Sequence, residues 1–275
     1  MRKLLLASAA GVALAAGSAR AADLGAPTYK GPPVVAPISI FTWTGCYLGG
    51  HVGGGWGRKD FSDTAAEDPD FFVGKTDPQS IRTNTSGFLG GGQVGCDLQL
   101  APGWMTWVAG IQGSGSGADI KGDVLDTFFP SSWGKTFHAK TDWLADVTGR
   151  IGIAWDRFMI YGKGGVAWVG DKYHVNELYL GTDPFTYDAS ETRIGFVAGI
   201  GLEWAFWNNW SAFLEYDFYG FGHKDLFFAC TNGTTGASCG QFGPVSVKQD
   251  INVVKFGINW RWNWGKAPAP IVARY

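Results

Sequence analysis

From Trp43 onward, apolar and polar side chains alternate with a period of two in eight separate runs. A period of two is typical of a β-strand, in which successive side chains point to opposite faces. Each run therefore predicts a strand with one apolar face and one polar face. The runs span approximately residues 43–57, 85–100, 104–117, 141–155, 158–173, 190–206, 210–222 and 249–262.

The connections between these runs alternate in length. Short turns occur at 101–103, 156–157 and 207–209. Long polar connections lie near 58–84, 118–140, 174–189 and 223–248. Tight turns join antiparallel neighbours, and outer-membrane barrels have short periplasmic turns and long extracellular loops. The sequence therefore predicts an all-β fold, an eight-stranded antiparallel up-and-down transmembrane β-barrel.

The run at 141–155 shows which face meets lipid. Its apolar face begins at Trp143 and ends at Trp155, whereas Asp146 and Arg150 lie on the opposite face. Twelve residues at ~3.3 Å each, tilted by about 40°, rise roughly 30 Å along the membrane normal. This rise places one tryptophan at each edge of an apolar band about 25 Å tall. We therefore expect the apolar faces outside and the charged faces inside.

Charges of both signs occupy the predicted inward faces. An eight-stranded barrel has an interior only wide enough for side chains, so these charges are expected to pair. We expect the resulting network to plug the lumen and not to catalyse a reaction. Its predicted members are Asp97, Asp146, Arg150, Lys163, Arg193, Glu203, Glu215, Asp217, Lys255 and Arg261.

The first 21 residues have the order of a secretory signal peptide, with basic Arg2 and Lys3, an apolar run at 4–16 and small residues before a cut after Ala21. About 13 apolar residues form a helix of only ~20 Å, too short for a ~30 Å hydrocarbon core. No later stretch reaches 18 consecutive apolar residues, so only a closed barrel could still span a membrane.

The predicted organisation has four parts. A signal peptide occupies 1–21, a proline-rich periplasmic lead-in 22–42, the barrel 43–264 and a periplasmic tail 265–275. The 42 glycines and 42 aromatic residues suit curved strands that are anchored at interfaces. Removal of the signal peptide leaves 19 basic against 24 acidic residues, a net charge of −5. An acidic exported chain is a poor binder of nucleic acid.

The last run ends with a polar residue, a glycine and two aromatic residues at fixed spacing, which are Lys255, Gly257, Trp260 and Trp262. This spacing resembles the signal that the outer-membrane assembly machinery reads on a last strand. That signal usually closes a chain, whereas 13 residues follow here. Either a periplasmic tail follows the barrel or Tyr275 takes part in the signal.

Several short motifs near the mature N-terminus carry a family resemblance. They are Ala21-Ala22-Asp23-Leu24, Tyr29-Lys30, Pro32-Pro33, Trp43-Thr44-Gly45, Tyr47 and Gly49-Gly50. Together they resemble the start of the porin-family major outer-membrane proteins of alphaproteobacteria, relatives of the OmpA-like barrel. The resemblance implies an eight-stranded barrel, a structural role in the envelope and, in some members, surface adhesion or haem binding. No residue of a haem-binding member can be matched to this chain.

Other motifs have simpler explanations. Gly90, Gly92 and Gly95 satisfy the dinucleotide-binding glycine pattern, but strand alternation runs straight through them, so no helix follows. The four histidines lack the spacing of metal ligands, and we expect neither a metal nor a cofactor. Cys230 and Cys239 bracket a polar loop in an oxidising compartment and predict a disulfide. Cys46 and Cys96 predict either a cross-strand disulfide or two separate thiols.

Three functions compete. The leading one is a structural outer-membrane barrel whose loops present an adhesion or recognition surface, and the second is a narrow diffusion porin. A membrane enzyme would need a nucleophile beside a base, and His51 is the only candidate base, with no serine at a suggestive spacing. We therefore expect no enzyme. The expected partners are outer-membrane lipid and lipopolysaccharide, the assembly machinery, and a host surface or haem.

Overall fold

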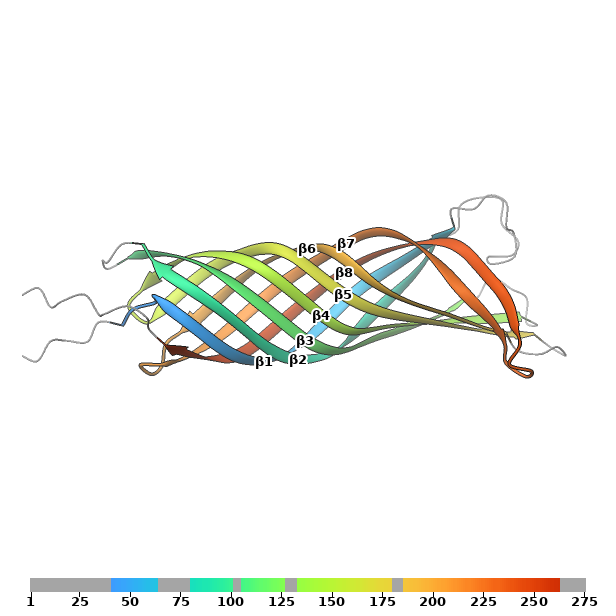
Figure 1. The fold of residues 1–275 in the computed structure, drawn as a ribbon, viewed down its shortest axis with the longest axis horizontal. Helices are drawn as coiled ribbons and strands as arrows, with labels where there is room; N and C mark the ends of the chain where they lie inside the picture. Colours follow the sequence, from blue (N-terminus) through green and yellow to red (C-terminus); the bar gives the residue numbers. More distant parts are fainter. Residues whose placement is uncertain (1–40, 64–79, 101–104, 127–132, 180–184, 263–275) are drawn as a thin grey trace, which may run out of the picture. The chain divides into compact units, whose positions relative to one another are not determined.

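The computed structural model describes residues 41–63, 80–100, 105–126, 133–179 and 185–262. Eight antiparallel strands pair in chain order, and β8 pairs with β1 to close a barrel (Figure 1). The predicted fold class is confirmed. The strands are β1 (Gly45–Asp63), β2 (Ser80–Gln99), β3 (Thr106–Asp126), β4 (Trp133–Trp155), β5 (Phe158–Tyr179), β6 (Phe185–Trp204), β7 (Trp210–Asn232) and β8 (Ser238–Trp262). In this part of the chain, no helix is long and apolar enough to cross a bilayer.

Several predictions fall outside these residues. They concern the signal peptide at 1–21, the lead-in up to residue 40, the turn at 101–103 and the tail at 265–275. All of them stay predictions. The short turns at 156–157 and 207–209 are present and join β4 to β5 and β6 to β7.

A continuous apolar belt surrounds the barrel near the end that carries the short turns. We call it the membrane band. Its outward-facing side chains include Leu48, Val52, Phe88, Val94, Trp107, Ile111, Val147, Ile151, Val166, Ile194, Phe196, Ile200, Leu214, Phe256 and Ile258, all exposed. On β4 the band begins at Trp143 and ends at Trp155, and both indoles are exposed. The face that sequence analysis assigned to lipid therefore points outward.

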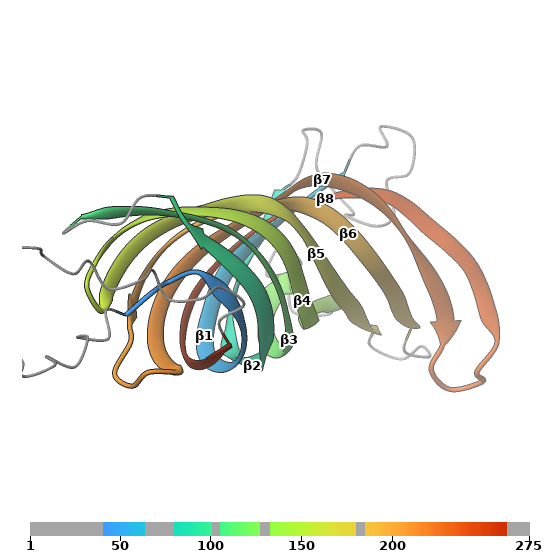
Figure 2. The ribbon, with the colours of Figure 1, turned by 60° about the vertical axis from the view of Figure 1, so that its left-hand side comes forward.

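The strands continue far beyond this band. They are between 19 and 25 residues long, whereas about 9–11 residues are enough for a tilted strand to cross a bilayer. The predicted strand ends at the long-loop side were therefore wrong. β4 starts at Trp133 and not near 141, and β8 starts at Ser238 and not near 249. Figure 2 shows β7 and β8 continuing together in this region.

We call this extension the wall. It comprises residues 58–63, 80–86, 119–126, 133–142, 170–179, 185–192, 222–232 and 238–250. In the wall the two faces exchange character. On β4, Phe137 and Ala139 are buried inside, while His138 and Lys140 face outward. Water surrounds the wall and lipid surrounds the band, so the apolar face turns inward in one and outward in the other.

Register shifts occur where the band meets the wall. β3 and β4 shift between the Gly117–Trp143 pair and the Ile120–Thr141 pair, and β7 and β8 shift beyond Gly220. On β4 the extra residue is Asp142, which allows Trp143 to point outward while Thr141 is fully buried. Such β-bulges re-aim the side chains that follow them. They therefore set which wall residues point inward.

Candidate functional site

The interior of the barrel consists of alternating polar and apolar layers. The inward-facing residues of β8 contribute to every one of these layers. From the turn end these are polar Arg261, Asn259 and Lys255, apolar Val253 and Ile251, polar Gln249, and apolar Val247 and Val245. All eight side chains are buried.

Arg150 lies at the centre of the first charged layer. Its guanidinium donates to both carboxylate oxygens of Asp97, with Nε 2.7 Å from Oδ1, and Nη1 lies 3.3 Å from Glu203 Oε2. The aromatic rings of Tyr47 and Tyr161 flank it, with centroids 4.7 and 4.8 Å from the guanidinium carbon. Paired hydrogen bonds together with cation–π contact hold an arginine in a single orientation.

Arg261 completes this layer and closes the turn end. Its Nη2 lies 2.9 Å from Asp97 Oδ2 and 2.9 Å from Glu203 Oε1. The guanidinium stacks over buried Trp43, 4.8 Å from the ring centroid. The Trp43 indole N–H donates to the carbonyl of Asp156 at 3.0 Å, which ties the residue to the β4–β5 turn. A large buried aromatic side chain therefore packs against Arg261 at this end of the interior.

A second charged group lies next along the barrel. Lys163 is 2.9 Å from Glu215 and 3.1 Å from Asp217, and Lys255 is 2.6 Å from Asp217. The Tyr161 hydroxyl donates to Glu215 at 2.6 Å and connects this group to Arg150. Asp146 joins through the Tyr219 hydroxyl, which donates to it at 3.0 Å. Nine of the ten predicted network residues are thus brought together.

Arg193 is the exception among the ten. It directly follows the wall segment of β6, and its guanidinium donates to the Val247 carbonyl at 2.8 Å and to the Tyr173 hydroxyl at 2.9 Å, both of which lie in the wall. The nearby ion pair is Lys59 with Asp171, at 2.8 Å, and sequence analysis missed it. Burial lowers the pKa of Lys59, and the charge of Asp171 opposes this shift.

A further buried pair, Lys135 with Glu177 at 3.4 Å, also lies in the wall. Sequence analysis missed it because both residues fall in segments that it assigned to loops. Among the described residues, the buried charged side chains comprise seven cations and seven anions. The interior charges therefore balance in number, and attraction between opposite charges offsets part of the cost of desolvating them.

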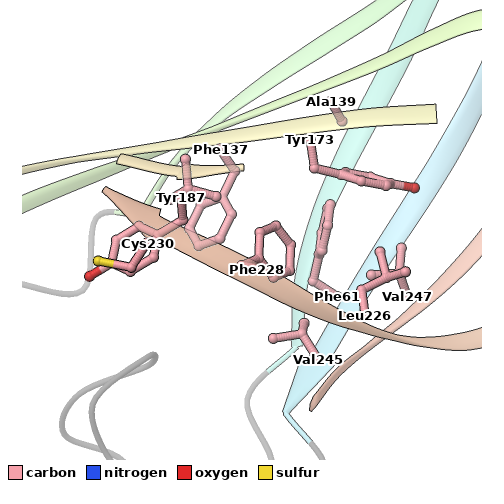
Figure 3. Close-up of a cluster of buried hydrophobic side chains, with 11 residues drawn as sticks. Phe61, Phe137, Ala139, Tyr173, Tyr187, Leu226, Phe228, Cys230, Val245 and Val247 are labelled. Atoms are coloured by element: carbon pink, nitrogen blue, oxygen red, sulfur yellow. The ribbon is translucent and has the colours of Figure 1, made fainter. Parts of the chain in front are cut away.

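An apolar layer separates the two connected charged groups from the ion pairs of the wall. The middle layer includes Leu89, Ile120, Val169, Tyr219 and Ile251. The outermost layer fills the wall, and Figure 3 shows its aromatic rings packed against each other. The Phe61 ring lies 5.9 Å from that of Phe137 and 5.8 Å from that of Tyr173. Sequence analysis did not foresee these layers, because it predicted ion pairs alone.

His51, the candidate catalytic base from the sequence analysis, lies deep inside the barrel. His51 Nε2 is 2.7 Å from the hydroxyl oxygen of Ser116, a serine that sequence spacing did not reveal because it is 65 residues away. The exposed fraction is 5% for His51 and 8% for Ser116. Both side chains therefore face the packed interior and not a surface where a substrate could dock.

Four cysteines form two disulfides, Cys46–Cys96 and Cys230–Cys239. The first joins directly opposed residues of β1 and β2. The second spans the end of the β7–β8 hairpin in the wall. Of the two alternatives for Cys46 and Cys96, the structure has the cross-strand disulfide.

The predicted assembly signal lies at the C-terminal end of β8. Lys255 faces inward, Trp260 faces outward, and a Cβ at Gly257 would collide with the Phe213 ring. Glycine therefore has a packing role at this position. Recognition by the assembly machinery stays a prediction.

The outward face of the wall carries a row of lysines just beyond the band. Lys121, Lys140 and Lys172 are register partners on β3, β4 and β5. Asp142 lies 2.7 Å from both Lys140 and Lys172, and hydrogen bonds from these lysines lower its pKa. On β4 the row lies directly beyond Trp143, the residue at which the membrane band begins.

Comparisons with known proteins place the chain in a family. A family model described as the OmpA-like transmembrane domain matches residues 132–263. The 31 kDa outer-membrane immunogenic protein of Brucella melitensis is 32% identical over 231 residues, which cover 82% of this chain and 90% of that protein. The chain belongs to the OmpA-like outer-membrane proteins of alphaproteobacteria. The predicted family is confirmed.

Other OmpA-like relatives and barrels are more distant. The 22 kDa outer membrane protein of Rhizobium leguminosarum is 27% identical over 217 residues, which cover 79% of this chain and 77% of that protein. The outer membrane protease OmpT of Escherichia coli is 9% identical with a TM-score of 0.47, covering 81% of this chain and 98% of OmpT. As an OmpA-like protein, this chain is an integral outer-membrane β-barrel, which confirms the predicted location.

Proposed function

We propose that this OmpA-like protein is a structural envelope barrel with a closed lumen, whose wall and loops present an adhesion or recognition surface. The observation that carries this proposal is the layered interior. Between Trp43 and the wall, the two connected charged groups are followed by an apolar layer that includes Val253 and Ile251, so no continuous polar path leads along the inward face of β8. We also propose that the protein is not an enzyme, because the His51–Ser116 pair is buried.

Conductance across planar bilayers tests the closed lumen. We expect the refolded protein to insert without steady channel openings, because ion movement would require several balanced ion pairs and two apolar layers to separate together. A general diffusion porin inserted under the same conditions is the positive control. Steady openings on the nanosiemens scale would contradict the proposal and favour the second candidate, a narrow diffusion pore.

The proposed partners follow from the outer surface. The lysine row of Lys121, Lys140 and Lys172 supports contact with phosphorylated lipids such as lipopolysaccharide. The wall beyond it supports contact with a host surface, and the family resemblance adds haem as a ligand to test. A binding screen of the folded protein in detergent against lipopolysaccharide, host-matrix proteins and haem would identify the ligand. No binding to any of the three would contradict the recognition role.

A further inference from the structure

Four side chains form one continuous row on the outward face of the wall. They are Asp123 on β3, His138 on β4, His174 on β5 and Asp188 on β6, and each is the register partner of the next. The two histidines are 36 positions apart in the chain. Sequence analysis therefore could not see this arrangement, because it depends on the register that follows the bulge at Asp142.

The two aspartates fix the orientation of the imidazole rings. The Nδ1 atom of His138 lies 2.6 Å from Asp123 Oδ1, and that of His174 lies 2.6 Å from Asp188 Oδ1. A carboxylate accepts hydrogen bonds, so Nδ1 carries the proton in both rings. The neutral ring then has its lone pair on Nε2. Metal-binding histidines usually donate their other ring N–H to a carboxylate, a backbone carbonyl or water in this way.

The spacing and exposure of the rings suit one shared ion. Their centroids are 6.2 Å apart and their planes are inclined by 31°. Two zinc–nitrogen bonds of about 2.1 Å span up to about 4 Å, so a shared ion requires the two Nε2 atoms to lie on the facing edges of the rings, closer together than the centroids. The side chains are 40% and 43% exposed, so water can reach both rings. They line a depression of about 590 Å³ on the wall.

The charges around the row favour a cation. Asp123 and Asp188 each bring a negative charge, and within the depression the nearest basic side chains are those of the lysine row. Those lysines are engaged by Asp119 and Asp142, at distances of 2.7 to 3.6 Å. Three lysines against two aspartates leave the row with a net charge of +1, which is smaller than the charge of −2 that Asp123 and Asp188 bring.

We propose that His138 and His174 form an open two-histidine site for a divalent transition metal ion on the extracellular wall. Imidazole ligands suit Cu²⁺, Ni²⁺ and Zn²⁺, and Cu²⁺ binds tightest in this series. Among the described residues, no group of three or more His, Cys, Asp and Glu side chains is arranged to hold a metal. Water, or a donor group from a second molecule, therefore fills the remaining coordination positions. The site does not depend on whether the lumen is closed.

Copper titration of untagged, refolded protein in detergent tests this site. We expect one Cu²⁺ per chain by calorimetry, and two nitrogen ligands in the electron paramagnetic resonance spectrum. The H138Q/H174Q variant should lose at least about 100-fold in affinity. The described residues contain no free cysteine, so thiols do not compete for the metal. Unchanged binding in H138Q/H174Q, or a spectrum with a single nitrogen ligand, would overturn the proposal.

Two further variants serve as matched tests. His223 is an exposed histidine on β7, outside the row, so H223Q should bind copper as the wild type does. Loss of copper binding in H223Q would show that the site lies elsewhere and would overturn the proposal. The D123N/D188N variant keeps both imidazoles and removes the orienting charges, and we expect a loss of about 10–100-fold. Unchanged affinity in this variant would contradict the role given to the aspartates.

Discussion

Replacement of Arg150 by methionine is expected to lower the free energy of unfolding by about 3–5 kcal/mol. Methionine keeps most of the stem that packs between Tyr47 and Tyr161 but removes the charge. Asp97 and Glu203 would then share Arg261 as their only cationic partner in this layer. A buried carboxylate without its partner is costly, and this cost dominates the expected loss. Denaturant titration in detergent micelles, followed by tryptophan fluorescence and gel mobility, measures the effect.

An exposed arginine offers the matched control for Arg150. Arg82 also pairs with an aspartate, Asp60, at 2.6 Å, but 64% of its side chain is exposed. Exposed ion pairs contribute little to stability, so R82M should unfold at nearly the wild-type denaturant concentration. The D97N/R150M double variant should recover about 1–3 kcal/mol relative to R150M. Equal losses in R150M and R82M would show that the interior charges do not hold the barrel together.

The second large effect is expected on the lipid-facing surface. Val94 faces outward near the middle of the band on β2 and is half exposed. Arginine at this position would place a charge at the centre of the bilayer, which costs about 2–4 kcal/mol in a transmembrane barrel. We therefore expect V94R to be destabilised by this amount when the protein is refolded into lipid vesicles. Reversible denaturant titration in the vesicles gives the value.

The same strand supplies the control for this variant. Asn84 lies ten positions before Val94 on the same outward face, but in the wall, where water surrounds the barrel. N84R should therefore change the stability by no more than about 0.5 kcal/mol, as is usual for a surface substitution. A comparable loss in V94R and N84R would show that the band does not face lipid. A loss of stability in N84R alone would show that lipid surrounds the wall and not the band.

The sequence predicts the membrane half of the barrel well because the outward face of each strand is apolar throughout that half and charged residues lie on the inward face. Trp143 and Trp155 bracket the band on β4, and inward charges such as Asp146 and Arg150 fall between apolar neighbours. Period-two alternation is unambiguous under these conditions. Nine of the ten predicted interior charges therefore come together in the structure.

The wall could not be predicted in the same way. Its strands continue after bulges that shift the register, as at Asp142. In the wall the alternation of apolar and polar residues is short, and the apolar residues face inward. Phe137 and Ala139 are therefore interpreted from the sequence as isolated apolar residues in a polar loop. Contacts such as Lys59–Asp171 and His138–His174 join strands whose register a single sequence does not specify. For this reason the interior ion pairs and the outward row of the wall could not be predicted from the sequence.

Because the wall consists of strands, the residues that stabilise it face inward and the residues that form its surface face outward. Inward positions such as Phe61 and Tyr173 pack in the buried core of the wall, whereas outward residues such as Arg82 are exposed. Substitutions at such outward positions usually change stability by less than about 0.5 kcal/mol. The exposed surface of the wall can therefore diversify in sequence while the scaffold beneath it stays the same.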